Sequence, residues 1–131
     1  GLSDSDPNYI ILRKGKLSEG LPDSPVGTDG VLARGTVAHG ADQWQHLRLD
    51  TTRLPNGDIL LSPRESDIAT QGMENPLWTE IPGMGQSVLD DRLGVATGST
   101  PLTNGRMGFA FQYTDVARRA FFTRIQCYQQ V

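Results

Sequence analysis

The sequence WQHLRLDTTRLPNGDILLS, residues 44–62, predicts two β-strands joined by a hairpin turn. Its first half alternates, so that Leu47 and Leu49 share one face while polar and charged residues share the other. This period of two is typical of a half-buried strand. The pair Asn56-Gly57 then supplies the positive φ angles that a tight turn between twisted strands requires. The residues from Asp58 onward form the expected returning strand.

Further strand candidates recur between turn residues along the whole chain. They comprise residues 9–14, 31–37, 77–81, 106–113 and 120–128. The clearest alternation places Met107, Phe109, Phe111 and Tyr113 on one face of residues 106–113, and Phe121, Thr123, Ile125 and Cys127 alternate in the last candidate. No segment of a dozen residues shows the 3.6-residue period of a helix. The sequence therefore predicts an all-β fold.

Two long segments lack a sustained period. Residues 63–76 contain charges, Pro and Gly, and they are expected to be a surface excursion after the hairpin. Residues 85–104 are expected to be mostly loop, with Leu89, Leu93 and Val95 as scattered apolar anchors. A loop of that length in a small domain is usually functional or packs across a sheet face.

Composition sets the broad class of the protein. The chain has 131 residues, 37% of them hydrophobic and 21% charged, which is typical of a single globular domain. Its 15 Gly and 8 Pro favour many short elements joined by turns. The net charge of −3 argues against nucleic acid as a partner, because phosphate neutralisation needs a basic face. The longest apolar runs are too short to cross a membrane.

The order of these segments resembles the laminin-G-like and concanavalin A-like β-sandwiches, in particular a version found in bacteriophage virion proteins. The resemblance is carried by residues 44–50, Asn56-Gly57, residues 78–84, 105–111 and 114–122. It implies an antiparallel jelly-roll sandwich that serves as a structural part of a capsid or tail. Thr123 stands where such domains often carry Asp, which leaves any role of that carboxylate in doubt.

The first strands of these sandwiches have no counterpart before Gly1. Residues 1–131 are therefore expected to form one sandwich domain that is the C-terminal part of a longer polypeptide. A sandwich without its first strands exposes sheet edges and part of its core, which favours association with other chains.

The candidate catalytic groups of this sequence are its acids and its possible nucleophiles. Glycosidases of this fold class need two facing carboxylates, whereas Asp50 and Glu80 each stand alone in a predicted strand. Asp90-Asp91 are adjacent, would point apart if extended, and are interpreted as solvated loop acids. Cys127 is either a nucleophile with His39 or His46, or a small buried hydrophobe in an apolar row, and the second interpretation is favoured.

The candidate ligand-binding residues also allow more than one interpretation. Calcium is conceivable at Asp4, Asp6 and Asn8 or at Asp90-Asp91, but such residues also build turns through local hydrogen bonds. Zinc would require a cluster of Cys and His that is not visible. Trp44 and Trp78 either stack on a sugar or pack in the core. Arg118-Arg119 either bind an acidic ligand or form a solvated corner or a subunit contact.

The sequence thus predicts a non-catalytic domain without catalytic, cofactor-binding or metal-binding residues. Its expected partners are other virion subunits, including further copies of itself, and its expected location is the virus particle. Nucleic acid and membrane are not expected partners. The alternative function is that of a lectin-like carbohydrate-binding domain for host recognition, and a degenerate glycosidase-type domain is a third interpretation.

Overall fold

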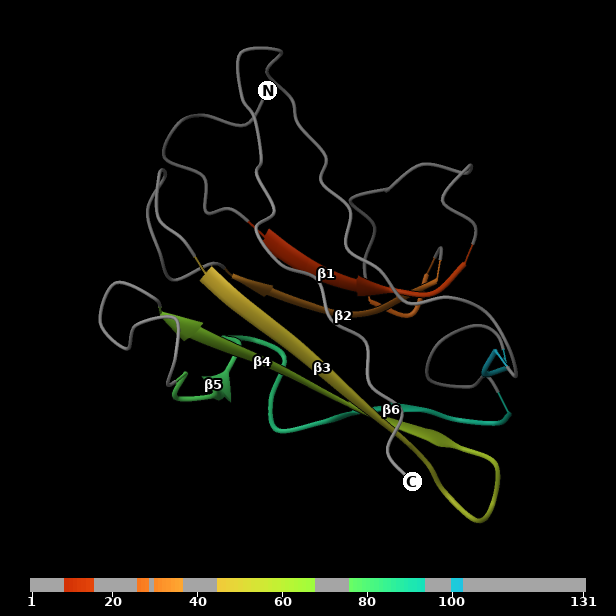
Figure 1. The fold of residues 1–131 in the computed structure, drawn as a ribbon. Coiled ribbons are helices and arrows are strands. Elements are labelled where there is room, and N and C mark those ends of the chain that lie inside the picture. Colours follow the sequence, from red (N-terminus) through yellow and green to blue (C-terminus); the bar gives the residue numbers. More distant parts are fainter. Residues whose placement is uncertain are drawn as a thin grey trace.

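The computed structural model describes residues 9–15, 26–28, 30–36, 45–67, 76–93 and 100–102. Within these ranges the chain forms strands and turns and no helix, which confirms the all-β prediction for this part of the protein (Figure 1). The strands are β1 (Tyr9–Arg13), β2 (Val31–Thr36), β3 (Gln45–Arg53), β4 (Ile59–Asp67), β5 (Thr79–Glu80) and β6 (Val88–Asp90).

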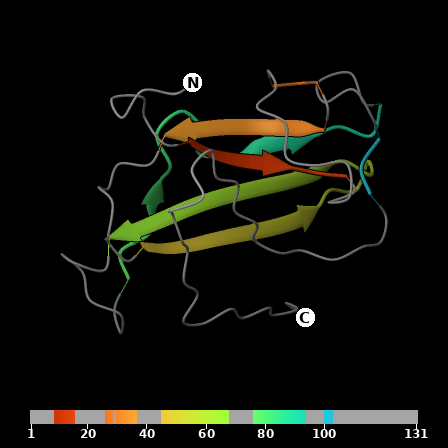
Figure 2. The same ribbon diagram turned by 90° about the horizontal axis from the view of Figure 1, so that it is seen from above.

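The strands form two antiparallel sheets. In the first sheet β1 pairs with β2, from Tyr9 opposite Thr36 to a register shift between Leu12 and Arg13. In the second sheet β3 and β4 form a long hairpin, and both β5 and β6 pair with the other edge of β4. One sheet lies over the other with strands running in similar directions, as Figures 1 and 2 show.

The predicted hairpin between β3 and β4 is confirmed. The Leu54 N–H donates to the Asp58 carbonyl at 2.8 Å, and the Gly57 N–H donates to the Leu54 carbonyl at 2.9 Å. Gly57 has a φ of 93°, a conformation that glycine adopts without the steric cost of a side chain. The Asn-Gly pair therefore sets the register of the whole hairpin.

The prediction of a surface excursion over residues 63–76 was wrong at its start. Strand β4 continues through Asp67, and Pro63, Glu65 and Ser66 are buried. Pro63 and the four charged or polar residues that follow it concealed the strand, because they interrupt the alternation of apolar residues by which a strand is recognised. Residues 68–75 lie outside the described part of the chain.

Pro63 is tolerated in β4 because of its position in the hydrogen-bond ladder. Paired residues of antiparallel strands alternate between hydrogen-bonded and non-hydrogen-bonded pairs. Since the Leu54 N–H donates to the Asp58 carbonyl, Leu49 and Pro63 form a non-hydrogen-bonded pair, and the missing N–H faces away from β3. On that side β5 pairs with Arg64 and Glu65, and β6 pairs with residues 59–61, so neither strand needs a bond from Pro63.

The core joins the two sheets. Ala33 of β2 packs with Ile81 and Met84 from the segment between β5 and β6. Partly buried residues of both sheets surround this cluster: Ile10, Leu12, Leu47 and Val88. The expected inward position of Leu47 is therefore confirmed.

The segment between β5 and β6 leaves its own sheet to reach β2. The Thr36 N–H donates to the Pro82 carbonyl at 2.9 Å, so the contact includes a backbone bond between the layers. A Cβ added at Gly35 would lie only 2.7 Å from Ile81 Cγ2 and from the Pro82 carbonyl oxygen. Only glycine lets the segment approach β2 this closely.

The expectation for residues 85–104 was wrong in its details. Val88–Asp90 form a strand, and Leu89 and Leu93 are 43% and 70% exposed rather than anchored. The inward positions of β6 belong to Val88 and Asp90, and the burial of Asp90 depends on a charged partner. Val95 and the predicted strands at residues 106–113 and 120–128 lie outside the described residues.

Candidate functional site

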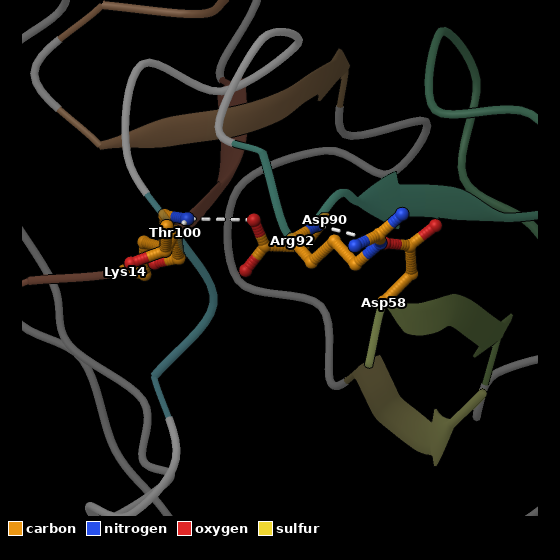
Figure 3. Close-up of polar contacts among 5 residues, drawn as sticks. All are labelled: Lys14, Asp58, Asp90, Arg92 and Thr100. Atoms are coloured by element: carbon orange, nitrogen blue, oxygen red, sulfur yellow. Dashed lines mark hydrogen bonds and ion pairs between the residues drawn. The ribbon is translucent and has the colours of Figure 1, made fainter. Parts of the chain in front are cut away.

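A buried ion pair connects the two sheets near the β3–β4 turn. Lys14 follows β1, and its Nζ lies 2.6 Å from Asp90 Oδ1 at the end of β6 (Figure 3). The two side chains are only 8% and 5% exposed. Lys14 Nζ also donates to the Thr100 carbonyl at 3.1 Å, which attaches a third segment to the same point. The interpretation of Asp90 as a solvated loop acid was therefore wrong, since a lysine distant in sequence neutralises it.

A second buried carboxylate fixes the hairpin turn. Asp58 is 8% exposed, and its Oδ1 accepts the backbone N–H of Arg92 at 2.7 Å. Its Oδ2 accepts a bond from Asn56 Nδ2 at 2.9 Å, while the Asp58 N–H donates to Asn56 Oδ1 at 3.0 Å. The turn is thus tied to the residues after β6, as Figure 3 shows.

A shallow pocket lies beside these hydrogen bonds. Its volume is about 240 Å³, and it is lined by Arg53, Gly57, Ile59, Arg92, Thr100, Pro101 and Leu102. The aliphatic stem of Arg92 packs over the turn, because a Cβ on Gly57 would lie 3.8 Å from Arg92 Cδ. Arg53 and Arg92 are the charged residues of this lining, and guanidinium groups can bind a small anionic group, such as a carboxylate, through charge-assisted hydrogen bonds.

A different cluster forms at the far end of the same sheet. The rings of Trp78 and His46 lie 6.0 Å apart between centroids, and Arg48 Cζ lies 5.7 Å from the Trp78 centroid. Arg48 Nε also pairs with Asp50 Oδ2 at 2.9 Å. His46 and Ser66 are directly paired across β3 and β4. Both His46 Nδ1 and Ser66 Oγ are buried, and neither has a hydrogen-bond partner among the described residues.

The structure brings together only some of the residues singled out from the sequence. Trp78 and His46, weighed separately, lie side by side, and Trp78 is half-buried rather than fully within the core. Asp50 is half-buried beside Arg48, while Glu80 is exposed on β5. The remaining candidates lie outside the described residues: Asp4, Asp6, Asn8, His39, Trp44, Arg118, Arg119 and Cys127.

No protein-family model, no curated protein and no solved structure shows significant similarity to this chain. Within the described ranges, no three His, Cys, Asp or Glu side chains are grouped as metal ligands would be. The same ranges contain no helix with the length and apolarity needed to span a bilayer.

Three structurally important residues had escaped the sequence reasoning. Lys14 and Asp58 were assigned no role, and Glu65 was placed in a surface loop, although it is 4% exposed and accepts a bond from Gln45 Nε2 at 2.5 Å. For Asp58 a signal existed, since Asn and Asp flanking a glycine commonly bond to each other's backbone. For Lys14 no local signal exists, because its partner Asp90 is 76 positions away.

Proposed function

We propose that this chain is a non-catalytic β-sandwich domain of a bacteriophage particle, which stabilises the capsid or tail through contacts with other subunits. The fold assigned in this proposal is a jelly-roll of the laminin-G-like and concanavalin A-like class. Its working location is the assembled virion, and its partners are other virion proteins and further copies of itself.

The observation that carries the proposal is the use of buried charge. Asp90 is neutralised by Lys14, Asp58 accepts bonds from Asn56 and from the Arg92 backbone, and Glu65 accepts a bond from Gln45. Each acid holds together segments of its own fold. A catalytic carboxylate pair would instead face a cleft across which a substrate binds.

The described surface also favours contacts. Four apolar side chains are more than half exposed: Val26, Leu77, Leu93 and Leu102. Single exposed apolar residues are common, but Leu102 lines the pocket beside the hairpin, which gives that part of the surface an apolar character. The assignment to a phage particle comes from the sequence resemblance described above, which extends over both described and undescribed residues.

The test is to locate the protein in purified particles. Virions of the phage that encodes this chain should be purified on a density gradient. Quantitative mass spectrometry of the virion fractions should then find the chain at a fixed ratio to the major capsid protein. The ratio should survive a high-salt wash, because a structural subunit is held by extensive contacts. Particles that lack the chain, or a purified protein that hydrolyses polysaccharides, would overturn the proposal.

A second candidate is carbohydrate binding for host recognition, and the Trp78 cluster favours it. A half-buried indole beside Arg48 and His46 combines an apolar ring with hydrogen-bond donors, as sugar sites do. Glycan-array screening should then reveal a ligand whose binding is lost in Trp78→Ala. Tyr9→Ala is the matched control, because Tyr9 is an aromatic residue on the first sheet. Equal binding by both variants and the natural protein would exclude Trp78 as the sugar-binding residue.

A further inference from the structure

Among the described strands, β3 has a partner on one side only, since it pairs with β4 and stands at the end of its sheet. The ladder fixes which backbone groups face the other side. Because Leu54 and Asp58 form a hydrogen-bonded pair, the even-numbered residues of β3 bond to β4. The N–H and C=O groups directed at the free edge belong to Gln45, Leu47, Leu49, Thr51 and Arg53.

The sequence of β3 is complementary to itself when two copies run antiparallel about Leu49. In this register Arg48 lies opposite Asp50 of the second copy, and Asp50 lies opposite Arg48. Both residues are nearly half exposed, with side chains 44% and 45% accessible. Opposite charges placed directly across two strands attract, and no like charges face each other along the nine residues.

The same register also pairs the backbone groups of the two edges and aligns the faces of the two sheets. Across the two copies, Leu49 lies opposite Leu49, Leu47 opposite Thr51, and Gln45 opposite Arg53. Every residue whose N–H faces the edge therefore lies opposite another residue of that kind. Each of these becomes a hydrogen-bonded pair. Residues that lie opposite each other point to the same side of the sheet. The face of β3 that carries Leu47 in one copy is therefore continuous with the same face in the second copy, so both copies keep their core-facing sides on one face.

Within the described part of the chain, β3 lacks three of the features that commonly block pairing at a sheet edge. Edge strands are commonly shortened, bulged or interrupted by proline. Strand β3 has nine residues, contains no proline, and pairs with β4 without a register shift, whereas the β1–β2 pair contains one.

We propose that two copies of this chain associate through β3, antiparallel about a two-fold axis at Leu49, to form one continuous sheet. This inference rests on the proposed function, because it names a subunit contact of the contact-making domain. The interface is isologous, so that the Arg48–Asp50 pair occurs twice.

Charge reversal tests the register. The natural protein should dimerise with rising concentration in sedimentation equilibrium. Arg48→Asp alone and Asp50→Arg alone should each weaken dimerisation about tenfold, because like charges then face each other twice. An equimolar mixture of the two variants should restore it, since every facing pair is then opposite in charge. Neither variant retains the Arg48–Asp50 pair within one chain, so restoration reports the contact between chains.

Glu80→Lys is the charge-reversal control. Glu80 is exposed on β5, which β4 separates from β3, so it pairs with neither Arg48 nor Asp50. Its reversal should leave the dimerisation constant within about twofold of the natural value. A natural protein that stays monomeric at millimolar concentration, or a mixture that binds no better than its components, would overturn the inference.

Amide hydrogen exchange distinguishes a second copy from another segment of the same chain on this edge. The amides of Leu47, Leu49 and Thr51 should exchange slowly in concentrated samples and fast on dilution, while those of Arg48 and Asp50 stay protected throughout. Protection of Leu49 that does not change on dilution would assign the edge to an intramolecular strand and refute the dimer. A monomer found in purified virions would refute the dimer and leave the proposed function standing.

Discussion

The two ends of the β3–β4 hairpin handle buried polar groups differently. At the turn, the carboxylates of Asp58 and Asp90 each accept bonds from groups distant in sequence. At the opposite end, His46 Nδ1 and Ser66 Oγ are buried, and the described residues offer neither of them a hydrogen-bond partner. A satisfied buried charge positions its segments, whereas an unsatisfied polar atom costs about 1–3 kcal/mol of stability.

The difference assigns separate roles to the two ends. The turn end is held by interactions that fail if one partner is removed, so it supplies rigidity. The Trp78 end retains hydrogen-bonding capacity that the described residues do not use, and such a group in a native protein requires an explanation, such as an ordered water, an ion or a catalytic role. Mutations at the two ends should therefore change stability in opposite directions.

The largest effect is expected for Lys14→Met. It removes the cation that lies 2.6 Å from the buried Asp90 carboxylate, and breaking one partner of such a pair costs about 3–5 kcal/mol. Urea denaturation should show this loss of unfolding free energy. The double variant Lys14→Met/Asp90→Leu should recover most of it, because neither charge of this pair then remains buried. A loss below about 1 kcal/mol in the single variant would show that the pair does not hold the sheets together.

A smaller loss is expected for Asp58→Ala, which removes the acceptor of the Arg92 N–H and of Asn56 Nδ2. We expect a decrease of about 2 kcal/mol in unfolding free energy, since two partly buried hydrogen bonds lose their charged acceptor. Glu80→Ala is the control, because Glu80 is an exposed acid on β5 and should change stability by less than about 0.5 kcal/mol. Equal losses in both variants would contradict the assigned role of Asp58.

Next in size is Gly57→Ala at the tip of the same turn. The φ of 93° is unfavourable for alanine, so a loss of about 1 kcal/mol is expected in thermal or urea unfolding. Gly85→Ala isolates the backbone effect, since its φ is 69° and no atom lies within 4 Å of the added Cβ. Similar losses of unfolding free energy at both glycines would show that the cost comes from the backbone conformation. A larger loss at Gly57 would show that its contact with Arg92 also contributes.

The smallest effect, and the only one of opposite sign, is expected for Ser66→Ala. The hydroxyl is buried without a partner, so its removal should leave stability unchanged or raise it by up to about 1 kcal/mol. Ser62→Ala, on the same face of β4, is the control. If Ser66→Ala destabilised the protein by more than about 1 kcal/mol, the Ser66 Oγ would have a partner, and the contrast between the two ends would fail.

The hairpin could be predicted from sequence because its causes are local. Alternation around Leu47 and the Asn56-Gly57 pair both act within a few residues, and the structure confirms them. The continuation of β4 through Pro63 could not be predicted from local sequence. Proline lacks a backbone N–H, and whether a strand tolerates it depends on whether a neighbouring strand would accept a hydrogen bond at that position. The burial of Asp90 was equally hidden, since it depends on Lys14 on another sheet.

The candidate site was predicted only in part for the same reason. Trp78 and His46 were recognised as ambiguous residues, but their proximity follows from the pairing of β3, β4 and β5. The pocket joins residues from β3, the turn, Arg92 and Thr100, which no single stretch of sequence brings together.

The backbone bond from Thr36 to Pro82 has a mechanical consequence. Side-chain packing between layers yields gradually under lateral load, whereas a peptide hydrogen bond between chain segments anchored in different sheets resists until it breaks. Sliding one layer past the other would strain this bond and drive Ile81 against Gly35, where the clearance is minimal. Sliding between the two layers is thereby opposed at one defined point, by a peptide hydrogen bond and a close contact together.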